Sequence, residues 1–330
     1  MGICTSSTSA IQTTIVRCHG IYCWRGNGYS WVWAHGFIWF YLSMWETFNK
    51  YSVHFYYMIP EIDLYDGVKE ELKFFTTSGV RVKLLINLNR EGMTVNQLRS
   101  EFGYRTSTLL PVLAELKSKG LIQQEDRCYD VTPFGKLISS KLIDFIETLS
   151  MFKTQEQFWK SHETYVIPEL FFRNIGSLVR SQIVEASPAD LFEVHRYFLK
   201  LVEGCSVING VSPFLHPELP RIFKIFIEHE AAVRLVVTSS VLELIRERHA
   251  EVLQHVGDMS NFSLRVIEED VGVAFTVTEK TLSLGFFRPD GTYDYNADLV
   301  SGDPAAIEWG NALFEYYWHR SADVTLQDTD

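Results

Sequence analysis

The chain has 330 residues, an apolar share of 46% and a formal net charge of -11 at pH 7. This length favours two folded units, and the apolar share is ordinary for globular proteins that bury a core. The negative charge argues against a protein that coats nucleic acid by neutralising phosphates. The five cysteines contain no CxxC pair and predict no disulfide framework, so we expect a reducing, cytoplasmic location. We expect neither a cofactor nor a metal site.

The first 57 residues differ in composition from the rest of the chain. They hold five of the eight Trp and three of the five Cys but only four charged residues. The aromatic run over 31–45 is shorter than the roughly twenty apolar residues that span a bilayer. Three interpretations are open: a membrane-associating segment, a folded aromatic cap, or translated upstream sequence outside the functional fold. We favour the third, because Met58 directly precedes a stretch of ordinary composition.

Residues 78–147 carry the most specific pattern in the sequence. Apolar residues at helical spacing predict a first helix over 78–88, which ends in the polar stretch 89–92. Thr94 at the N-cap and Gln97 three residues later form a capping box, which predicts the start of a second helix. Gly103 ends that helix.

A third helix follows a tight turn at residues 104–105. The three hydroxyl residues 106–108 are candidate N-caps, and Pro111 is expected near the first turn. Gly120 is the left-handed residue that ends the helix. Two short strands, 121–124 and 128–131, then form a hairpin, and a Thr-Pro pair begins the next helix. This order of elements is that of a winged helix-turn-helix.

A winged helix-turn-helix reads DNA with short polar and basic groups at the start of its third helix, and nearby basic groups contact phosphates. The candidate DNA-binding residues are Thr94, Arg105, Thr106, Ser107, Thr108, Lys117, Lys119 and Arg127. Alternatively, the hydroxyl residues are only caps and the two lysines only a solvated helix end. Residues 78–147 hold ten Lys/Arg against eight Asp/Glu. We therefore expect modest affinity per monomer and a dependence on dimerisation.

The segment TVNQLRSEFGYRTSTLLPVLAELKSKGLIQQEDRCYDVTPFGK resembles the winged-helix domain of archaeal ArsR/MarR-like transcriptional regulators. The resemblance implies a DNA-binding domain and does not identify the operator. Pro111 departs from the pattern, because it falls among the residues that would face the groove.

An apolar seam continues beyond the hairpin. It consists of Ile138, Leu142, Phe145, Leu149, Phe152 and Trp159. Steps of 3 and 4 residues are typical of helix-on-helix packing. The helix either covers the core of its own domain or forms a dimer interface. We favour a homodimer through the helix Ile138–Trp159, because the seam is longer than a small winged helix needs.

Strand and helix patterns alternate in the C-terminal half. Predicted strands are 181–185, 205–211, 232–238, 263–267, 272–277 and 281–286, and predicted helices are 190–202, 217–228, 239–249 and 304–320. The expected fold class is α+β, an N-terminal winged helix-turn-helix followed by an α/β sandwich. The expected divisions are a leader (1–57), the DNA-binding domain (58–150), a helical dimerisation linker (151–178), a sensor or regulatory domain (179–322) and a tail (323–330).

Five C-terminal segments carry a second resemblance. They are QEQFWKSHETYVIPELFFRNIGSLV, INGVSPFLHPELPRIF, VRLVVTSSVLELI, GVAFTVTEKTLSLGFFRPDGTYD and IEWGNALFEYYWHRS. They resemble the methanogenesis regulatory protein family of archaea, which implies a winged helix followed by a middle domain. The domain is also distantly similar to the phospholipase-D-like domains that sense ligands in archaeal sugar regulators. The His-x-Lys pair that catalytic members need is absent from this sequence.

A small-molecule site is expected where strands end at their carboxyl side. The candidate ligand-binding residues are Asn209, Ser212, His216, Thr238, Ser239, Ser240 and Arg288. Residues 238–240 begin a helix, where an anion would be stabilised, although a plain N-cap is the simpler interpretation. His216 and Arg288 are more readily explained as structural or solvated side chains than as ligands.

These features predict a sequence-specific DNA-binding transcriptional regulator whose C-terminal domain senses a small molecule or mediates assembly. Double-stranded DNA, a second copy of the chain and a small-molecule effector are the expected partners. The alternative is an enzyme of unknown reaction that uses the winged helix as an interaction module. The sequence has no GxSxG, HExxH or Walker motif to support that alternative. A membrane-tethered regulator is a third possibility.

Overall fold

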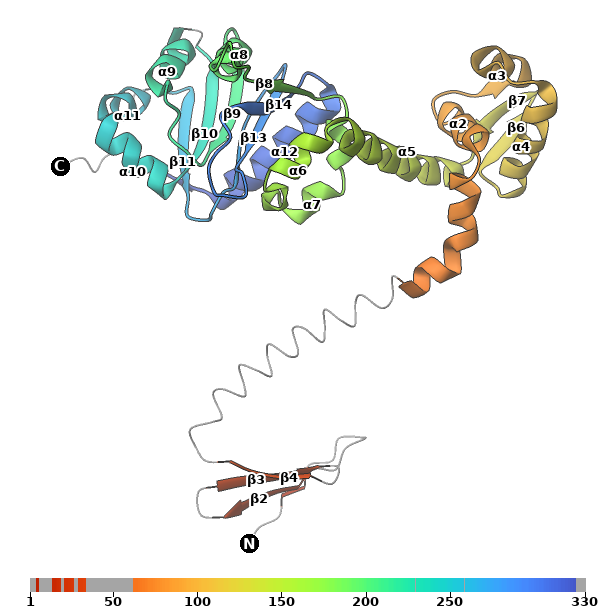
Figure 1. The fold of residues 1–330 in the computed structure, drawn as a ribbon, viewed down its shortest axis with the longest axis horizontal. Coiled ribbons are helices and arrows are strands. Elements are labelled where there is room, and N and C mark those ends of the chain that lie inside the picture. The colour runs from red at the N-terminus through yellow and green to blue at the C-terminus, as the bar shows by residue number, and fades with distance from the viewer. Residues whose placement is uncertain are drawn as a thin grey trace. The chain divides into compact units, whose positions relative to one another are not determined.

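The structure, a computed structural model, describes residues 62–228, 230–257 and 259–324 together with four strands before residue 34. The chain divides into two compact units, Met1–Lys83 and Leu84–Asp330, and each is described by itself (Figure 1). The first unit contains an antiparallel sheet in sequence order and a helix over 62–76. The strands are β1 (Cys4–Thr5), β2 (Thr14–Cys18), β3 (Ile21–Gly26) and β4 (Tyr29–Trp33). The prediction for the leader 1–57 falls mostly outside the described residues and stays a prediction.

The second unit begins within α2 (Gly79–Leu88). It continues with β5 (Met93–Thr94), α3 (Val95–Phe102), α4 (Thr106–Ser118), β6 (Ile122–Glu125) and β7 (Cys128–Val131). The three helices and the hairpin agree with the sequence prediction, and β5 adds a third strand beside β7. We call residues 79–131 the helix–hairpin segment. Its core is made of Leu84, Leu85, Leu88, Leu98, Leu109, Leu113 and Leu116, all of which are buried.

Capping interactions define the start of α3. The predicted capping box is confirmed, because the Gln97 N–H donates to Thr94 Oγ1 at 3.4 Å and the Thr94 N–H donates to Gln97 Oε1 at 2.8 Å. Gly120 ends α4 with a φ of 68°, also as predicted. Asp126 and Arg127 both have positive φ in the hairpin turn, which matches the twist of two-residue hairpins.

Two predictions for α4 are wrong. The N-cap is Arg105, and Thr106 is the first helical residue, so residues 106–108 are not caps. Pro111 lies inside the helix and not in its first turn. Proline has no N–H, so the carbonyl of Ser107 loses its usual donor one turn later. The helix tolerates this because both residues are exposed and water can replace the missing donor.

The helix α5 (Pro133–Thr154) begins as predicted, with the Gly135 N–H donating to Thr132 Oγ1 at 2.9 Å. The prediction of one helix through Trp159 is wrong, because the chain breaks at Gln155 and α6 (Glu156–Ser161) follows. Gln155 is buried there: its amide donates to the Ser181 carbonyl at 2.9 Å and accepts from Trp159 Nε1 at 3.0 Å. Trp159 therefore belongs to a core and not to an exposed seam.

The C-terminal part of the second unit contains an eight-stranded sheet with the order β15-β11-β10-β9-β12-β13-β14-β8. The strands are β8 (Gln182–Glu185), β9 (Val207–Ser212), β10 (Ala232–Thr238), β11 (Phe262–Ile267), β12 (Val273–Thr278), β13 (Leu282–Phe286), β14 (Ala297–Ser301) and β15 (Ala322–Asp323). Strands β9, β10 and β11 are parallel, and the other pairs are antiparallel. All six predicted strands are present, whereas β14 and β15 were not predicted.

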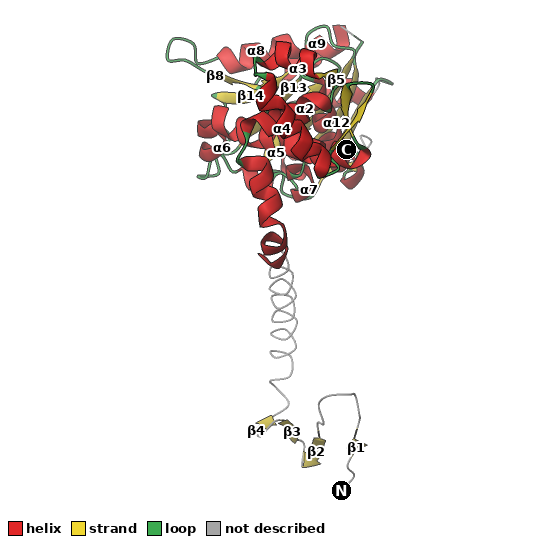
Figure 2. Cartoon of the chain, turned by 90° about the vertical axis from the view of Figure 1, so that its right-hand side faces the viewer, coloured by secondary structure: helices red, strands yellow, loops and turns green. Residues whose placement is uncertain are grey.

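Helices cover both faces of this sheet and create two hydrophobic cores. On one face are α6, α7 (Glu169–Phe172), two 3-10 turns (Thr164–Val166 and Ile175–Leu178) and α12 (Pro304–Arg320). On the other are α8 (Glu193–Val202), α9 (Leu219–Glu228), α10 (Ser239–Arg248) and α11 (Ala250–Gly257). Helices and strands together make a mixed α+β fold (Figure 2). Among the described residues, no helix combines the length and apolar character needed to cross a bilayer.

We predict that Gly135→Ala destabilises the helix–hairpin segment. A Cβ at position 135 would lie 1.8 Å from the Leu121 carbonyl oxygen, so α5 and the start of the hairpin would have to move apart. We expect a loss of about 1–3 kcal/mol, measured by urea unfolding. The control is Gly67→Ala, because a Cβ there meets no atom within 4 Å. Equal unfolding midpoints for the two variants would contradict the close packing at Gly135.

Candidate functional site

The start of α4 presents a polar and basic surface. Arg105 and residues 106–108 are exposed, while Leu109 is buried in the core behind them. The Arg105 side chain makes no capping hydrogen bond. The side chains at the first turn of α4 therefore point away from the segment's own core, as a nucleic-acid contact would require.

The other candidate DNA-binding residues occupy different positions. Lys117 Nζ donates to Gln124 Oε1 at 3.4 Å, which joins the end of α4 to β6. Lys119 is exposed after the helix, and Arg127 is exposed at the hairpin turn. The Thr94 hydroxyl is engaged in the capping box of α3, so this side chain positions a helix.

The centre of the exposed face of α4 is apolar, and the exposed acidic Glu115 follows it toward the end of the helix. Leu110 is 47% exposed, and Pro111 and Ala114 are exposed on the same side of the helix. Arg105 and Lys117 lie at its two ends. The surface is therefore apolar in its centre and basic at its ends.

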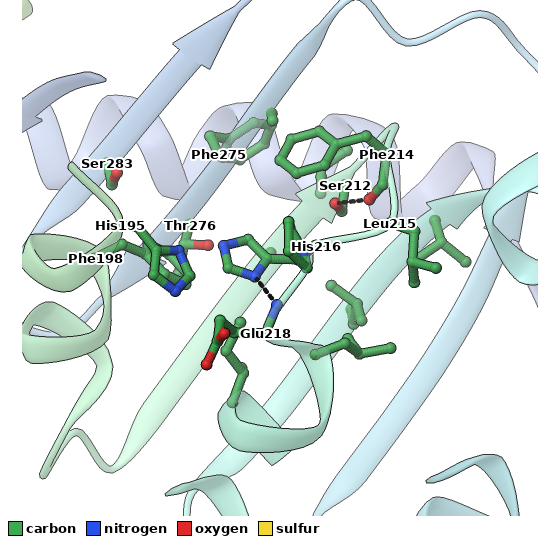
Figure 3. A pocket seen from close by; sticks show the side chains of 18 of the residues that line it. His195, Phe198, Ser212, Phe214, Leu215, His216, Glu218, Phe275, Thr276 and Ser283 are labelled. Atoms are coloured by element: carbon green, nitrogen blue, oxygen red, sulfur yellow. Dashed lines mark hydrogen bonds between the residues drawn. The ribbon is translucent and has the colours of Figure 1, made fainter. Parts of the chain in front are cut away.

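The second candidate site is a cavity of about 350 Å³ between the sheet and the helices α8 and α9 (Figure 3). Strand residues Gly210, Leu235 and Thr276 lie on the sheet side of the cavity. Helix residues Phe198 and Ile222 lie opposite them. Aliphatic and aromatic side chains thus form most of the wall.

Two histidines stack at one side of the cavity. The rings of His195 and His216 are 4.7 Å apart, with 22° between their planes. The Glu218 N–H donates to His216 Nδ1 at 3.2 Å, so the neutral ring carries its proton on Nε2. His195 Nε2 is buried and has no hydrogen-bond partner.

Burial keeps both histidine rings neutral. It lowers the pKa of His216 to about 4, and the neighbouring His195 contributes to the same change. Burial also lowers the pKa of His195 from its ordinary 6.5. At neutral pH the pair therefore offers uncharged donors and acceptors to the cavity.

A carboxyl group lies at another side of the cavity. Asp298 Oδ2 accepts from Ser283 Oγ at 3.0 Å, and burial raises the pKa of Asp298 to about 6. Gly285 makes room for this cluster, because a Cβ there would lie 2.0 Å from the hydroxyl of Tyr293. Burial raises the pKa of the Tyr293 phenol well above its usual range, so the phenol stays protonated.

The structure does not bring the predicted ligand residues together. Ser212 and His216 line the cavity. Asn209 faces the opposite side of the sheet, where its Oδ1 accepts from Arg234 Nε at 2.9 Å. Residues 238–240 lie outside the cavity at the start of α10, where Thr238 makes no side-chain capping bond. Arg288 forms an ion pair with Asp294 at 2.7 Å in a separate pocket.

Sequence reasoning missed His195, the partner of His216. The signal was present, since Phe198 and Val202 follow it at helical spacing on the inward face of α8. A lone histidine in an amphipathic helix is nevertheless more often a solvated or core residue, and only the tertiary structure places it against His216.

Two family models match the chain. The N-terminal domain of the methanogenesis regulatory protein FilR1 matches residues 69–150, and its middle domain matches residues 191–320. A curated relative, the methanogenesis regulatory protein FilR1 of Methanothrix harundinacea (strain 6Ac), is 28% identical over 271 residues. The aligned region covers 81% of this chain and 60% of the relative, so the chain spans less than two thirds of that protein.

Solved structures show only distant likeness. TrmBL2, an archaeal chromatin protein, is 12% identical with a TM-score of 0.36, covering 76% of this chain and 97% of its own. The dimethyltransferase RosA from Streptomyces davawensis is 11% identical with a TM-score of 0.23, and the match covers 63% of this chain and 66% of RosA. At these TM-scores the likeness establishes neither a common fold nor a common function.

We predict opposite pH responses for variants of His216 and Asp298. Because the folded pKa of His216 lies near 4 and its ordinary value is 6.5, its contribution to stability is present above pH 6.5 and lost as the pH falls toward 4. The difference corresponds to about 3 kcal/mol, so His216→Leu should flatten the acid side of the stability profile.

Asp298 changes the stability with pH in the opposite direction to His216, because its pKa in the folded protein is raised from 3.8 to about 6. Its ionisation costs stability as the pH rises from about 4 through 6, and Asp298→Asn should remove that loss. Urea midpoints measured from pH 4 to 8 test both variants against the parent protein. Parallel profiles for all three proteins would contradict the assignment.

Proposed function

We propose that this chain, a member of the methanogenesis regulatory protein FilR1 family, is a DNA-binding transcriptional regulator. The exposed turn Arg105–Thr108 at the start of α4 carries the proposal. It lies in the range matched by the N-terminal domain of the family. The helix–hairpin segment would act as a winged helix of the ArsR-like type, with α4 in the major groove and the β6–β7 hairpin beside the backbone.

The charge distribution defines how such a contact would work. Arg105 at one end of α4 and Lys117 at the other would contact phosphates, and residues 106–108 would reach base edges. Leu110 in the centre of the face would pack against the methyl group of thymine. Few phosphates are neutralised in this arrangement, so one copy would bind weakly and a palindromic site would need two.

A second copy of the chain would dock on α5. Phe145, Leu149 and Phe152 follow each other at steps of 4 and 3 and are 55%, 54% and 42% exposed. Large apolar side chains in such a row are costly to leave in water, and burying each contributes about 1.5–3 kcal/mol. The dimer interface proposed here therefore ends at Phe152, before the break at Gln155.

The sheet domain would be the regulatory part of the protein. It coincides with the range matched by the middle domain of the family and encloses the cavity beside His195 and His216. A small molecule bound there would be the effector. The family is named for regulation and not for catalysis, so we propose no enzymatic activity.

We predict that Arg105→Ala with Lys117→Ala weakens binding to promoter DNA at least tenfold. Removal of two phosphate contacts should also make the salt dependence less steep by about two units of slope. Retardation of promoter fragments at several salt concentrations measures both quantities. The control is Lys153→Ala with Lys200→Ala, which removes two exposed charges outside the helix–hairpin segment. Equal affinity for the two double variants would refute the placement of the DNA contact on α4.

We predict that Phe145→Asp with Leu149→Asp makes the protein monomeric, because two buried carboxylates would face their counterparts across the interface. Light scattering after size exclusion at micromolar concentration measures the mass. Leu170→Asp is the control, since Leu170 is equally exposed but lies on α7. A parent protein that is already a monomer would contradict the dimer, and so would a double variant that remains dimeric.

A further inference from the structure

We propose that the cavity beside α8 and α9 binds an uncharged, mostly apolar small molecule that offers one hydrogen-bond acceptor, such as a carbonyl oxygen, to His216. The inference deepens the proposed function, because it specifies the chemical class of the effector. The binding itself requires no DNA and can be tested separately.

The size and walls of the cavity suit such a ligand. Its volume of about 350 Å³ lies within the range of pockets for small organic molecules. Phe198, Ile222 and Leu235 provide apolar surface on the helix and sheet sides. At the rim, Phe192 and Tyr295 are exposed aromatic residues that would cover part of an entering molecule.

The charges around the cavity disfavour an anion. Arg234 is the single Lys or Arg among its lining residues. The Arg234 guanidinium is engaged on the opposite face of the sheet, where it pairs with Glu315 at 2.8 Å and lies over the ring of Phe314. Asp298 and Glu218 are acidic. A ligand carboxylate or phosphate would lose its water without gaining a cationic partner, which is costly.

The polar groups identify where a neutral ligand would be held. Because Nδ1 of His216 accepts from the Glu218 N–H, Nε2 carries the proton and is a donor. His195 Nε2 is buried without a hydrogen-bond partner beside this donor, which costs free energy. Thr276 adds a hydroxyl group to the lining of the same cavity (Figure 3). A carbonyl oxygen that accepts from His216 Nε2 would satisfy the donor on this side of the cavity.

The test uses the full-length protein and the fluorescent ketone prodan, which is uncharged and shifts its emission in apolar surroundings. We expect a blue shift and saturable binding. Two non-fluorescent competitors of equal size then distinguish neutral from anionic ligands: 2-acetylnaphthalene is a neutral ketone, and 2-naphthoate is a carboxylate. We expect the ketone to displace prodan at concentrations at least tenfold lower than the carboxylate. No saturable binding, or equal displacement by the two competitors, would overturn the proposal.

Two variants of cavity residues test whether prodan binds in this cavity. Thr276→Phe would fill it and should weaken prodan binding at least tenfold, whereas His216→Leu keeps the apolar wall and should reduce the preference for the ketone. The control is Leu170→Ala, which changes an exposed apolar side chain on α7. If Thr276→Phe does not fold by circular dichroism, Ala274→Leu replaces it on the same strand face. Prodan binding that falls in Leu170→Ala and persists in the cavity variants would overturn the proposal.

The outcome is independent of the proposed regulator function. Retardation of promoter DNA without binding of prodan would refute the cavity inference alone. Ketone-selective binding in the cavity without retardation of DNA would refute the regulator alone.

Discussion

Helices cover both faces of the eight-stranded sheet, and this constraint decides which hydrophobic core each inward-facing side chain along its strands joins. Successive residues of β9 illustrate the effect: Ile208 belongs to the core with α9, and Val211 belongs to the core with α12. Asn209 faces the α12 side and donates to Asn311 at 3.3 Å, while Gly210 faces the cavity. Alternation by one residue thus separates a structural hydrogen-bond network from a candidate ligand site.

The break at Gln155 follows from the same burial. A helix that continued through Trp159 would leave the indole on the apolar seam of α5. The observed turn instead places Trp159 in the core against Phe286 and satisfies the buried Gln155 amide. Of the remaining seam residues, Phe145, Leu149 and Phe152 stay exposed. The core therefore takes the last residue of the predicted seam.

The cavity combines two opposed electrostatic effects of burial. Loss of water lowers the pKa of His216 and raises the pKa of Asp298, so each change favours the uncharged form. At neutral pH the two histidines are therefore hydrogen-bonding dipoles, whereas Asp298, with a pKa of about 6, is mostly ionised. Such a lining selects ligands by shape and by one or two hydrogen bonds, which is how buried sites discriminate among neutral molecules.

The sequence by itself determined the local elements of the protein. The helix ends could be predicted because capping residues act on backbone groups only a few residues away in the sequence. The examples are Thr94 with Gln97 at the start of α3, Gly120 after α4, and Thr132 with Pro133 at the start of α5. The strands were predictable for the same reason, since alternation and β-branched content are local. Arg105 was correctly expected at the start of the third helix. The prediction that residues 106–108 cap this helix was wrong.

Only the tertiary structure decided which distant residues meet. His195 and His216 come from α8 and from the loop before α9, and no periodicity in either segment indicates that their rings stack. Asn209 and Ser212 are three residues apart on one strand and lie on opposite faces of the sheet, because side-chain direction alternates. The site therefore depends on packing between elements, and the sequence specifies that packing only through the fold as a whole.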